Sequence, residues 1–94
     1  MTYMRITTGR IDSGNVDELR KLAPDLVAAV RRMPGCQSFT GGVDRTSGRT
    51  ITVSTWDTQE HAGYAAEALG DVVQKIRAAG TQIDPPQVFE VITQ

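Results

Sequence analysis

Three side chains suited to catalysis or binding lie close together in the chain: the ionisable His61 and Tyr64, and the indole of Trp56. The imidazole of His61 titrates near neutral pH, so this residue is a candidate general base. Residues three apart on a helix share a face, and this spacing predicts that His61 and Tyr64 point into one cleft as a catalytic pair. Trp56, the only tryptophan, can form a wall of that cleft and donate its indole N–H to a ligand oxygen.

Each of these residues also has a structural interpretation that the sequence leaves open. Trp56 can fix a helix against a sheet, His61 can be a solvated first-turn residue, and Tyr64 can bury its ring while its hydroxyl stays wet. Thr52 lies four residues before Trp56 on one predicted strand face, where its hydroxyl can hydrogen-bond a ligand. We therefore expect Trp56, Thr52 and Tyr64 to bind substrate, if the protein has one.

Composition excludes several other classes of site. Ten basic and eleven acidic residues give a net charge of −1, which favours neither nucleic acid nor an anionic membrane as a partner. One histidine and one cysteine exclude a multi-histidine metal cage and an internal disulfide. Cys36 is interpreted as a small buried hydrophobe. The arginines of the strands are interpreted as solvated surface groups: Arg5, Arg10, Arg45 and Arg49.

The N-terminal residues lack the apolar stretch of a signal peptide, and no segment has the roughly 18 apolar residues that cross a bilayer. These features predict a reducing, cytoplasmic location.

The elements that position these side chains alternate between strand and helix. β-Branched and apolar runs bounded by turn residues predict four strands, over residues 3–11, 36–44, 49–56 and 87–94. Apolar residues at steps of three and four predict two helices, over residues 15–33 and 57–79. The order β-α-β-β-α-β is that of the ferredoxin-like α+β unit, a four-stranded antiparallel sheet with both helices on one face. The length of 94 residues suits a single domain over 1–94.

Several local signals refine this outline. Asn15 and Asp57 are predicted helix caps, each followed three residues later by a glutamate. Pro24 predicts a kink or short break in the first helix, and Gly70-Asp71 predicts an interruption of the second. The Gly41-Gly42 pair predicts a bulge in the second strand or a close approach of another backbone.

The last strand predicts that the protein associates with itself. Val88, Phe89, Val91 and Ile92 make this strand apolar on both sides, whereas a sheet with one open face should alternate apolar and polar residues. The chain has no further element to cover the open face. A second copy is the simplest cover, so we expect a homodimer whose two sheets pack face to face.

Two motifs and the element order resemble a known family. The run Met33-Pro34-Gly35-Cys36 precedes a strand, a polar hairpin and a second strand, and Trp56-Asp57-Thr58-Gln59-Glu60 then opens a helix. This arrangement resembles the antibiotic biosynthesis monooxygenase (ABM) domain of the dimeric α+β barrel superfamily. The resemblance implies two ferredoxin-like protomers that form a barrel, with a pocket between sheet and helices in each subunit.

The resemblance also implies candidate activities. Some members oxidise aromatic polyketide intermediates with molecular oxygen and with no metal or flavin, and others degrade haem. The haem-degrading pattern needs a first-strand asparagine and a helix histidine. Thr7, Thr8 and Gly9 occupy the first region, and Ala65, Ala66 and Glu67 the second. Haem degradation is therefore not expected.

In the polyketide-oxidising pattern an asparagine precedes the strand-end tryptophan and a tyrosine follows on the helix. Here Thr52 stands in the asparagine's place, Trp56 matches the tryptophan, and Tyr64 falls near the tyrosine's place. The resemblance thus implies a monooxygenase without a cofactor that acts on a small aromatic or quinone-type substrate. The alternative is a non-catalytic ligand-binding or regulatory homodimer with the same fold.

Overall fold

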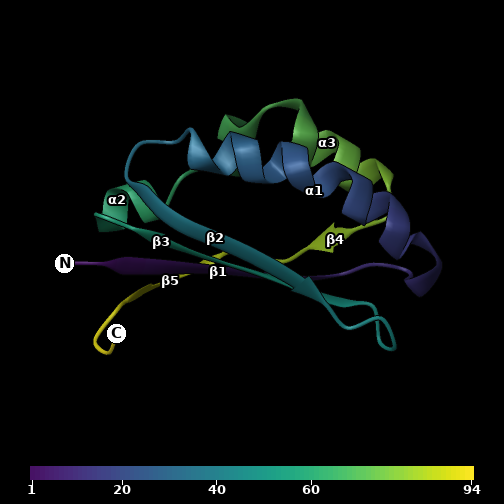
Figure 1. The fold of residues 1–94 in the computed structure, drawn as a ribbon, viewed down its shortest axis with the longest axis horizontal. Helices are drawn as coiled ribbons and strands as arrows, with labels where there is room; N and C mark the ends of the chain where they lie inside the picture. The colour runs from purple at the N-terminus through teal and green to yellow at the C-terminus, as the bar shows by residue number, and fades with distance from the viewer.

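The computed structural model describes all 94 residues as a sheet with helices over one face (Figure 1). The long strands are β1 (Tyr3–Arg10), β2 (Cys36–Val43) and β3 (Arg49–Trp56), and the short strands are β4 (Gln82–Ile83) and β5 (Gln87–Glu90). The helices are α1 (Val16–Arg31), α2 (Gln59–Ala62) and α3 (Asp71–Ala78), with 3-10 turns over Ser13–Asn15 and Ala66–Leu69. No helix is long and apolar enough to cross a membrane.

The sheet is antiparallel, with β1 at its centre. Its order is β2-β3-β1-β4, and β5 also pairs with β1. The two short strands share one edge of β1: β4 pairs with Gly9 and Arg10, and β5 pairs with Tyr3 to Ile6. Together they fill the place of the single fourth strand, so the ferredoxin-like prediction is confirmed at the level of the fold. The predicted strand over 87–94 ends at Glu90, and β4 precedes it.

Residue alternation fixes which side chains face the helices. Arg5 of β1 hydrogen-bonds to backbone oxygens of Ala62 and Tyr64, so its side of the sheet is the helix side. Arg5 lies opposite Ser54, and both share this face with the other odd residues of β1 and even residues of β3. The opposite face carries no helix (Figure 1).

The second predicted helix is divided into three pieces. The one-turn helix α2 ends at Ala62 with Gly63 as its cap, Tyr64 and Ala65 are not helical, and α3 begins only at Asp71. Thr58, not Asp57, caps α2, because its Oγ1 accepts the backbone N–H of His61 at 3.0 Å. The prediction that His61 and Tyr64 share a helix face is therefore wrong.

Three other local predictions are confirmed in part or corrected. Asn15 is the N-cap residue of α1, as predicted, but its side chain makes no capping bond. Helix α1 runs through Pro24, so the predicted break is absent. The irregularity of β2 lies between Cys36 and Ser38, while Gly41 and Gly42 pair regularly with β3.

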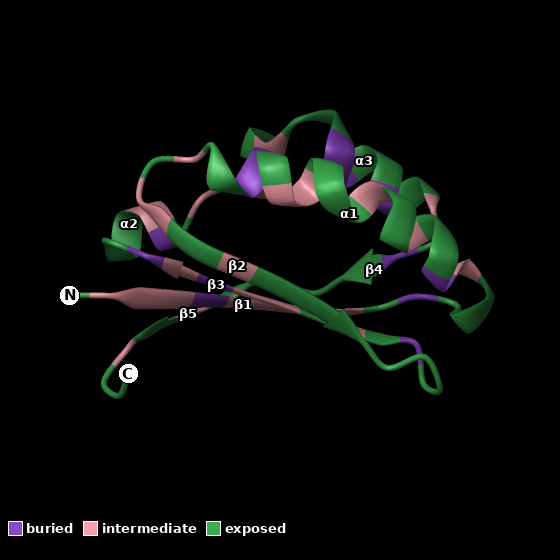
Figure 2. Cartoon of the chain, viewed as in Figure 1, coloured by how far each residue is buried: buried purple, intermediate pink, exposed green.

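Burial is concentrated in two small clusters (Figure 2). One joins α1 to α3 through Ala29, Val72, Val73 and Ile76. The other lies at the α2 end of the sheet, where Val30, Trp56 and Ala62 are fully buried. Between sheet and helices, away from the second cluster, the two layers do not close.

Candidate functional site

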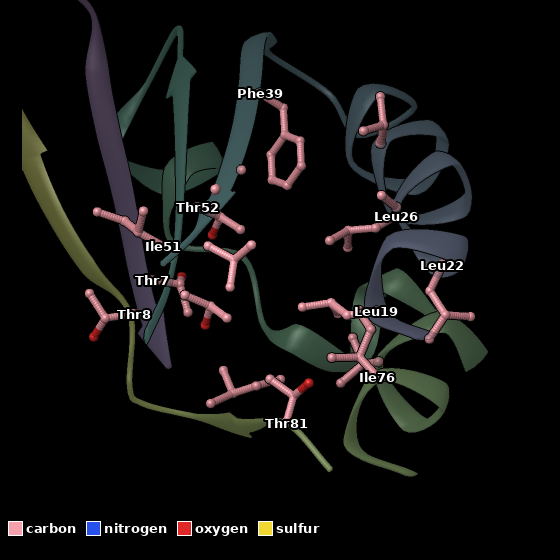
Figure 3. A pocket seen from close by; sticks show the side chains of 18 of the residues that line it. Thr7, Thr8, Leu19, Leu22, Leu26, Phe39, Ile51, Thr52, Ile76 and Thr81 are labelled. Carbon is pink, nitrogen blue, oxygen red and sulfur yellow. The ribbon is translucent and has the colours of Figure 1, made fainter. Parts of the chain in front are cut away.

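A cavity of about 460 Å³ lies between the sheet and the helices (Figure 3). The helices contribute large apolar side chains to its wall, among them Leu19, Leu22 and Leu26 of α1 and Ile76 of α3. The sheet contributes small residues, among them Thr7, Thr50, Thr52 and Gly41.

Cross-strand rows explain why the cavity forms where it does. At the α2 end, the row on the helix side holds Tyr3 and Trp56, and the next holds Arg5, Ser54 and Phe39. The two rows after these hold Thr7, Thr52 and Gly41, and then Gly9, Thr50 and Val43. The first two rows carry large side chains on the sheet and the last two carry small ones, so the layers are held apart at the large end while the small end stays hollow.

The predicted residues Thr52 and Tyr64 both line the cavity. Trp56 and His61 are not among its lining residues. Trp56 is fully buried and donates its indole N–H to Oγ of Ser54 at 2.8 Å, so that donor is already paired. Its ring contacts that of Tyr64, with centroids 5.2 Å apart and a tilt of 52°, and so supports the cavity wall from behind.

His61 lies beside the turn that precedes β2. Its Nδ1 is 2.6 Å from Oδ1 of Asp57, and both groups lie beside Gly35. The hydrogen bond with His61 holds the pKa of the Asp57 carboxyl below its usual value. The pair belongs to the junction of α2 with the turn before β2, and the structure does not bring His61 and Tyr64 into one cleft.

Arg5 is the polar residue of the cavity that sequence reasoning missed. It was expected to be solvated, yet it is only 6% exposed. Its Nη1 donates to backbone oxygens of Ala62 at 3.0 Å and of Tyr64 at 2.6 Å, and its Cζ lies 3.7 Å from the centre of the Tyr64 ring. Burial lowers the pKa of the guanidinium, but arginine stays protonated in proteins. The cavity therefore has a fixed positive charge at this end.

Tyr64 responds to the same surroundings. Burial raises the pKa of its phenol, and the positive charge of Arg5 offsets part of that shift. The phenol is therefore protonated at neutral pH and is a hydrogen-bond donor rather than a base. Apart from Tyr64, the ionisable residues of the lining are Arg5, Arg20 and Arg45, and none is an acid or a histidine.

Only part of the signal for Arg5 is present in the sequence. Alternation places the even residues of β3, including Trp56, on one face, as expected. The register that places Arg5 of β1 beside Ser54 of β3 cannot be read from the sequence.

The free thiol of Cys36 is partly buried, and burial raises its pKa, which suits an unreactive thiol. No group of three or more His, Cys, Asp or Glu residues is placed to hold a metal ion.

Solved structures share this fold. SnoaB, a cofactor-independent oxygenase from Streptomyces nogalater, matches in a variant form with a TM-score of 0.75 at 13% identity, over 99% of this chain and 95% of that one. Rv0793 from Mycobacterium tuberculosis matches with a TM-score of 0.72 at 13% identity, over 100% and 98%. These identities support the fold alone. No curated protein matches the chain in sequence.

The family model supplies the remaining evidence. The model described as antibiotic biosynthesis monooxygenase (ABM) matches residues 2–69, which include β1 to β3, α1 and Tyr64. That span covers most of the chain and most of the cavity wall on the sheet side. The chain belongs to the antibiotic biosynthesis monooxygenase family.

Proposed function

We propose that the protein is a cofactor-independent monooxygenase that oxidises a small aromatic or quinone-type molecule bound between sheet and helices. The observation that carries this proposal is the 460 Å³ cavity, which has apolar walls and ends at Arg5 and Tyr64. A cavity of this size and lining suits a small ring system. SnoaB, which shares the fold, is a cofactor-independent oxygenase.

The residues at the polar end have complementary roles in this proposal. The guanidinium of Arg5 stabilises an enolate or phenolate oxygen of the substrate, which lowers the substrate's own pKa. The Tyr64 hydroxyl donates a second hydrogen bond to the substrate, and Thr52 offers a third polar contact. Trp56 holds the Tyr64 ring in place.

Once ionised, the substrate supplies the electrons for oxygen. A ring methylene loses its proton to water and becomes a carbanion, which reacts with O₂ and forms the carbon–oxygen bond of a peroxide that takes a proton back from water. Loss of water then leaves a ketone, so that R₂CH₂ + O₂ gives R₂C=O + H₂O. All four electrons come from the substrate carbon, and no external reductant is needed.

One observation favours the alternative of a non-catalytic ligand-binding or regulatory protein. No carboxylate or histidine lines the cavity, and the Tyr64 phenol is protonated at neutral pH. A substrate that does not ionise beside Arg5 therefore meets no base in the lining. Such a molecule would bind and be released unchanged.

Oxygen uptake tests the two functions directly. An electrode assay with anthrone and substituted hydroquinones should show uptake above the uncatalysed rate, and calorimetry should show binding. Tyr64→Phe should slow uptake about 10-fold or more, since it removes one donor to the anion, and Trp56→Phe should slow it less. Thr46→Val, at an exposed position of the β2–β3 hairpin outside both the cavity lining and the open face of the sheet, is the matched control.

Equal uptake by the wild type and Tyr64→Phe would remove our site assignment. Binding without uptake across the panel would favour the regulatory alternative. Strong loss in His61→Ala, with folding intact, would return His61 to the role of general base and contradict a site built on Arg5 and Tyr64.

We also propose that the protein is a homodimer through the open face of the sheet. That face carries Met4, Ile6, Val53, Ile51 and Phe89, of which Ile51 is 43% and Phe89 44% exposed. An apolar patch of this kind on an open sheet face suits a second copy of the same sheet. Light scattering should give a dimer mass, and Phe89→Glu should shift it to the monomer. A wild-type monomer at micromolar concentration would contradict the proposal.

A further inference from the structure

Two buried polar atoms of the molecule have no hydrogen-bond partner, and both belong to residues of the cavity wall. They are Nε of Arg5 and Oγ1 of Thr81. Arg5 is 6% exposed and Thr81 8%. Proteins rarely leave buried donors and acceptors unpaired, because such groups have lost their water without gaining a partner. That both unpaired atoms occur at one cavity suggests that its occupant pairs them.

Arg5 is a buried cation without a counter-ion. The three ion pairs of the molecule, Lys21–Glu18, Arg45–Asp17 and His61–Asp57, all involve other residues. The neighbours of Arg5 are two backbone oxygens and the face of an aromatic ring, which orient the guanidinium but do not neutralise it. The other arginines at the cavity, Arg20 and Arg45, are exposed to water. A buried, oriented and uncompensated guanidinium favours an anion.

Thr81 lies at the far end of the cavity. It precedes Gln82, which pairs with Arg10 of β1, whereas Arg5 points toward α2. Five residues of strand separate Arg5 from Arg10, which is about 16 Å. A threonine hydroxyl can donate or accept, so this end suits a neutral hydroxyl or carbonyl. Between the two ends the helix side of the wall is apolar, with Leu19, Leu22 and Ile76 labelled in Figure 3.

We infer that the cavity binds an elongated, mainly apolar molecule with an anionic oxygen against Arg5 and a hydroxyl or carbonyl against Thr81. The inference rests on the proposed function, since it describes the occupant of the same cavity. Among aromatic molecules, the cavity described in this way favours those that carry a polar group at each end. A carboxylate and an ionised phenol both supply the anionic oxygen.

Rigid biphenyls test the inference by calorimetry with the wild type alone. 4′-Hydroxybiphenyl-4-carboxylate carries both groups, biphenyl-4-carboxylate lacks the hydroxyl, and biphenyl-4-ol is neutral at about pH 7. We expect the carboxylate to bind about 10-fold or more tightly than the neutral phenol, and the second hydroxyl to add about 3-fold to 10-fold. The ionisable phenol 3-nitrobiphenyl-4-ol, measured above and below its own pKa, distinguishes a phenolate from a carboxylate as the preferred anion.

Two variants test which residue recognises each end of the ligand. Arg5→Gln should remove the preference for the carboxylate. Thr81→Val should remove only the gain from the distal hydroxyl, and it should keep or raise the melting temperature of the empty protein, because its hydroxyl has no partner to lose. Thr46→Val should change none of these values. Should Arg5→Gln fail to fold, the wild-type ligand series and Thr81→Val still test both ends.

The outcomes separate this inference from the proposed function. Equal affinity for the carboxylate and the neutral phenol, or a hydroxyl gain that survives Thr81→Val, would overturn the inference and leave an apolar cavity in place. Failure of all four biphenyls to bind would overturn the inference, whereas the proposed function is decided separately by oxygen uptake with anthrone.

Discussion

The sheet and the helices pack closely at one end of their interface and leave a cavity at the other, although the same strands run through both ends. At the α2 end, Trp56 fills the space between the layers and is fully buried with Val30 and Ala62. Four residues earlier on the same face of β3, Thr52 borders a cavity. Backbone geometry is the same at both positions, so side-chain volume on the sheet decides where the layers close and where they leave a site.

This difference also predicts that the packed end contributes mainly to stability and the cavity mainly to ligand binding. The packed end has its polar groups paired, as with the indole N–H of Trp56 on Ser54. The two unpaired buried groups both belong to residues that line the cavity, Arg5 at its border with the packed end and Thr81. Substitutions at the packed end should therefore change the free energy of unfolding, and substitutions at the cavity should change ligand affinity.

Trp56→Ala tests the packed end and has the largest expected effect. It removes the largest fully buried side chain and the support of the Tyr64 ring. We expect it to lower the free energy of unfolding by about 3–5 kcal/mol, measured by urea denaturation. A loss below about 1 kcal/mol would mean that this end is not the packed one.

Two glycines give a matched comparison of the ends. Gly35 has φ of +80°, and a methyl group there would overlap Oδ1 of Asp57 and Nδ1 of His61. Gly41, at the cavity, has an ordinary φ, and a methyl group there would be 3.5 Å from Cγ2 of Thr52. We expect Gly35→Ala to cost about 2 kcal/mol or more and Gly41→Ala to change stability by less than about 1 kcal/mol. Equal losses in the free energy of unfolding of the two variants, measured by chemical denaturation, would contradict the distinction between a packed end and a hollow end.

Thr52→Phe should fill the cavity from the sheet. Added volume enters space that is already empty, so we expect the free energy of unfolding to change by less than about 1 kcal/mol. Binding of biphenyl-4-ol, measured by calorimetry, should be lost. Retained binding with intact folding would show that the ligand occupies some other surface, such as the open face of the sheet.

The sequence predicted what local patterns control. The bounds of β3 are as predicted, and so is the common face of Thr52, Ser54 and Trp56, because β-branched runs and alternation are local signals. The predicted interruption of the second helix at Gly70-Asp71 is confirmed, since α3 begins at Asp71. The helix predicted before it failed because Gly63 ends α2 after one turn, which the spacing of His61 and Tyr64 cannot reveal.

Arg5 shows why the rest could not be predicted. Arginine is usually solvated, and its burial here depends on two backbone oxygens that lie 57 and 59 residues away in sequence. The cavity likewise depends on strand register, which places Thr7 beside Thr52 and Gly41. These are tertiary effects that act against residue preference, and no spacing rule contains them.

Acid titration compares two carboxylates at the ends of the sheet and has the smallest expected effect. Asp57 accepts a hydrogen bond from His61 beside the packed end, and Asp44 accepts the backbone N–H groups of Thr46 and Ser47 in the β2–β3 hairpin. These bonds lower the pKa of both carboxyls from the usual value of 3.8. Each group therefore stabilises the fold above about pH 4, and this stabilisation is lost as the pH falls through the lowered pKa.

Both carboxylates are exposed, so the expected change is modest. Urea denaturation between about pH 5 and pH 2 should show a smaller loss of stability in Asp57→Asn and in Asp44→Asn than in the wild type. The double variant should be the least sensitive to acid, because the two sites lie far apart and their effects should add. An acid dependence that is unchanged in Asp57→Asn would mean that His61 does not hold this carboxylate in solution. The contact that fixes the turn at Gly35 against α2 would then have to come from packing alone.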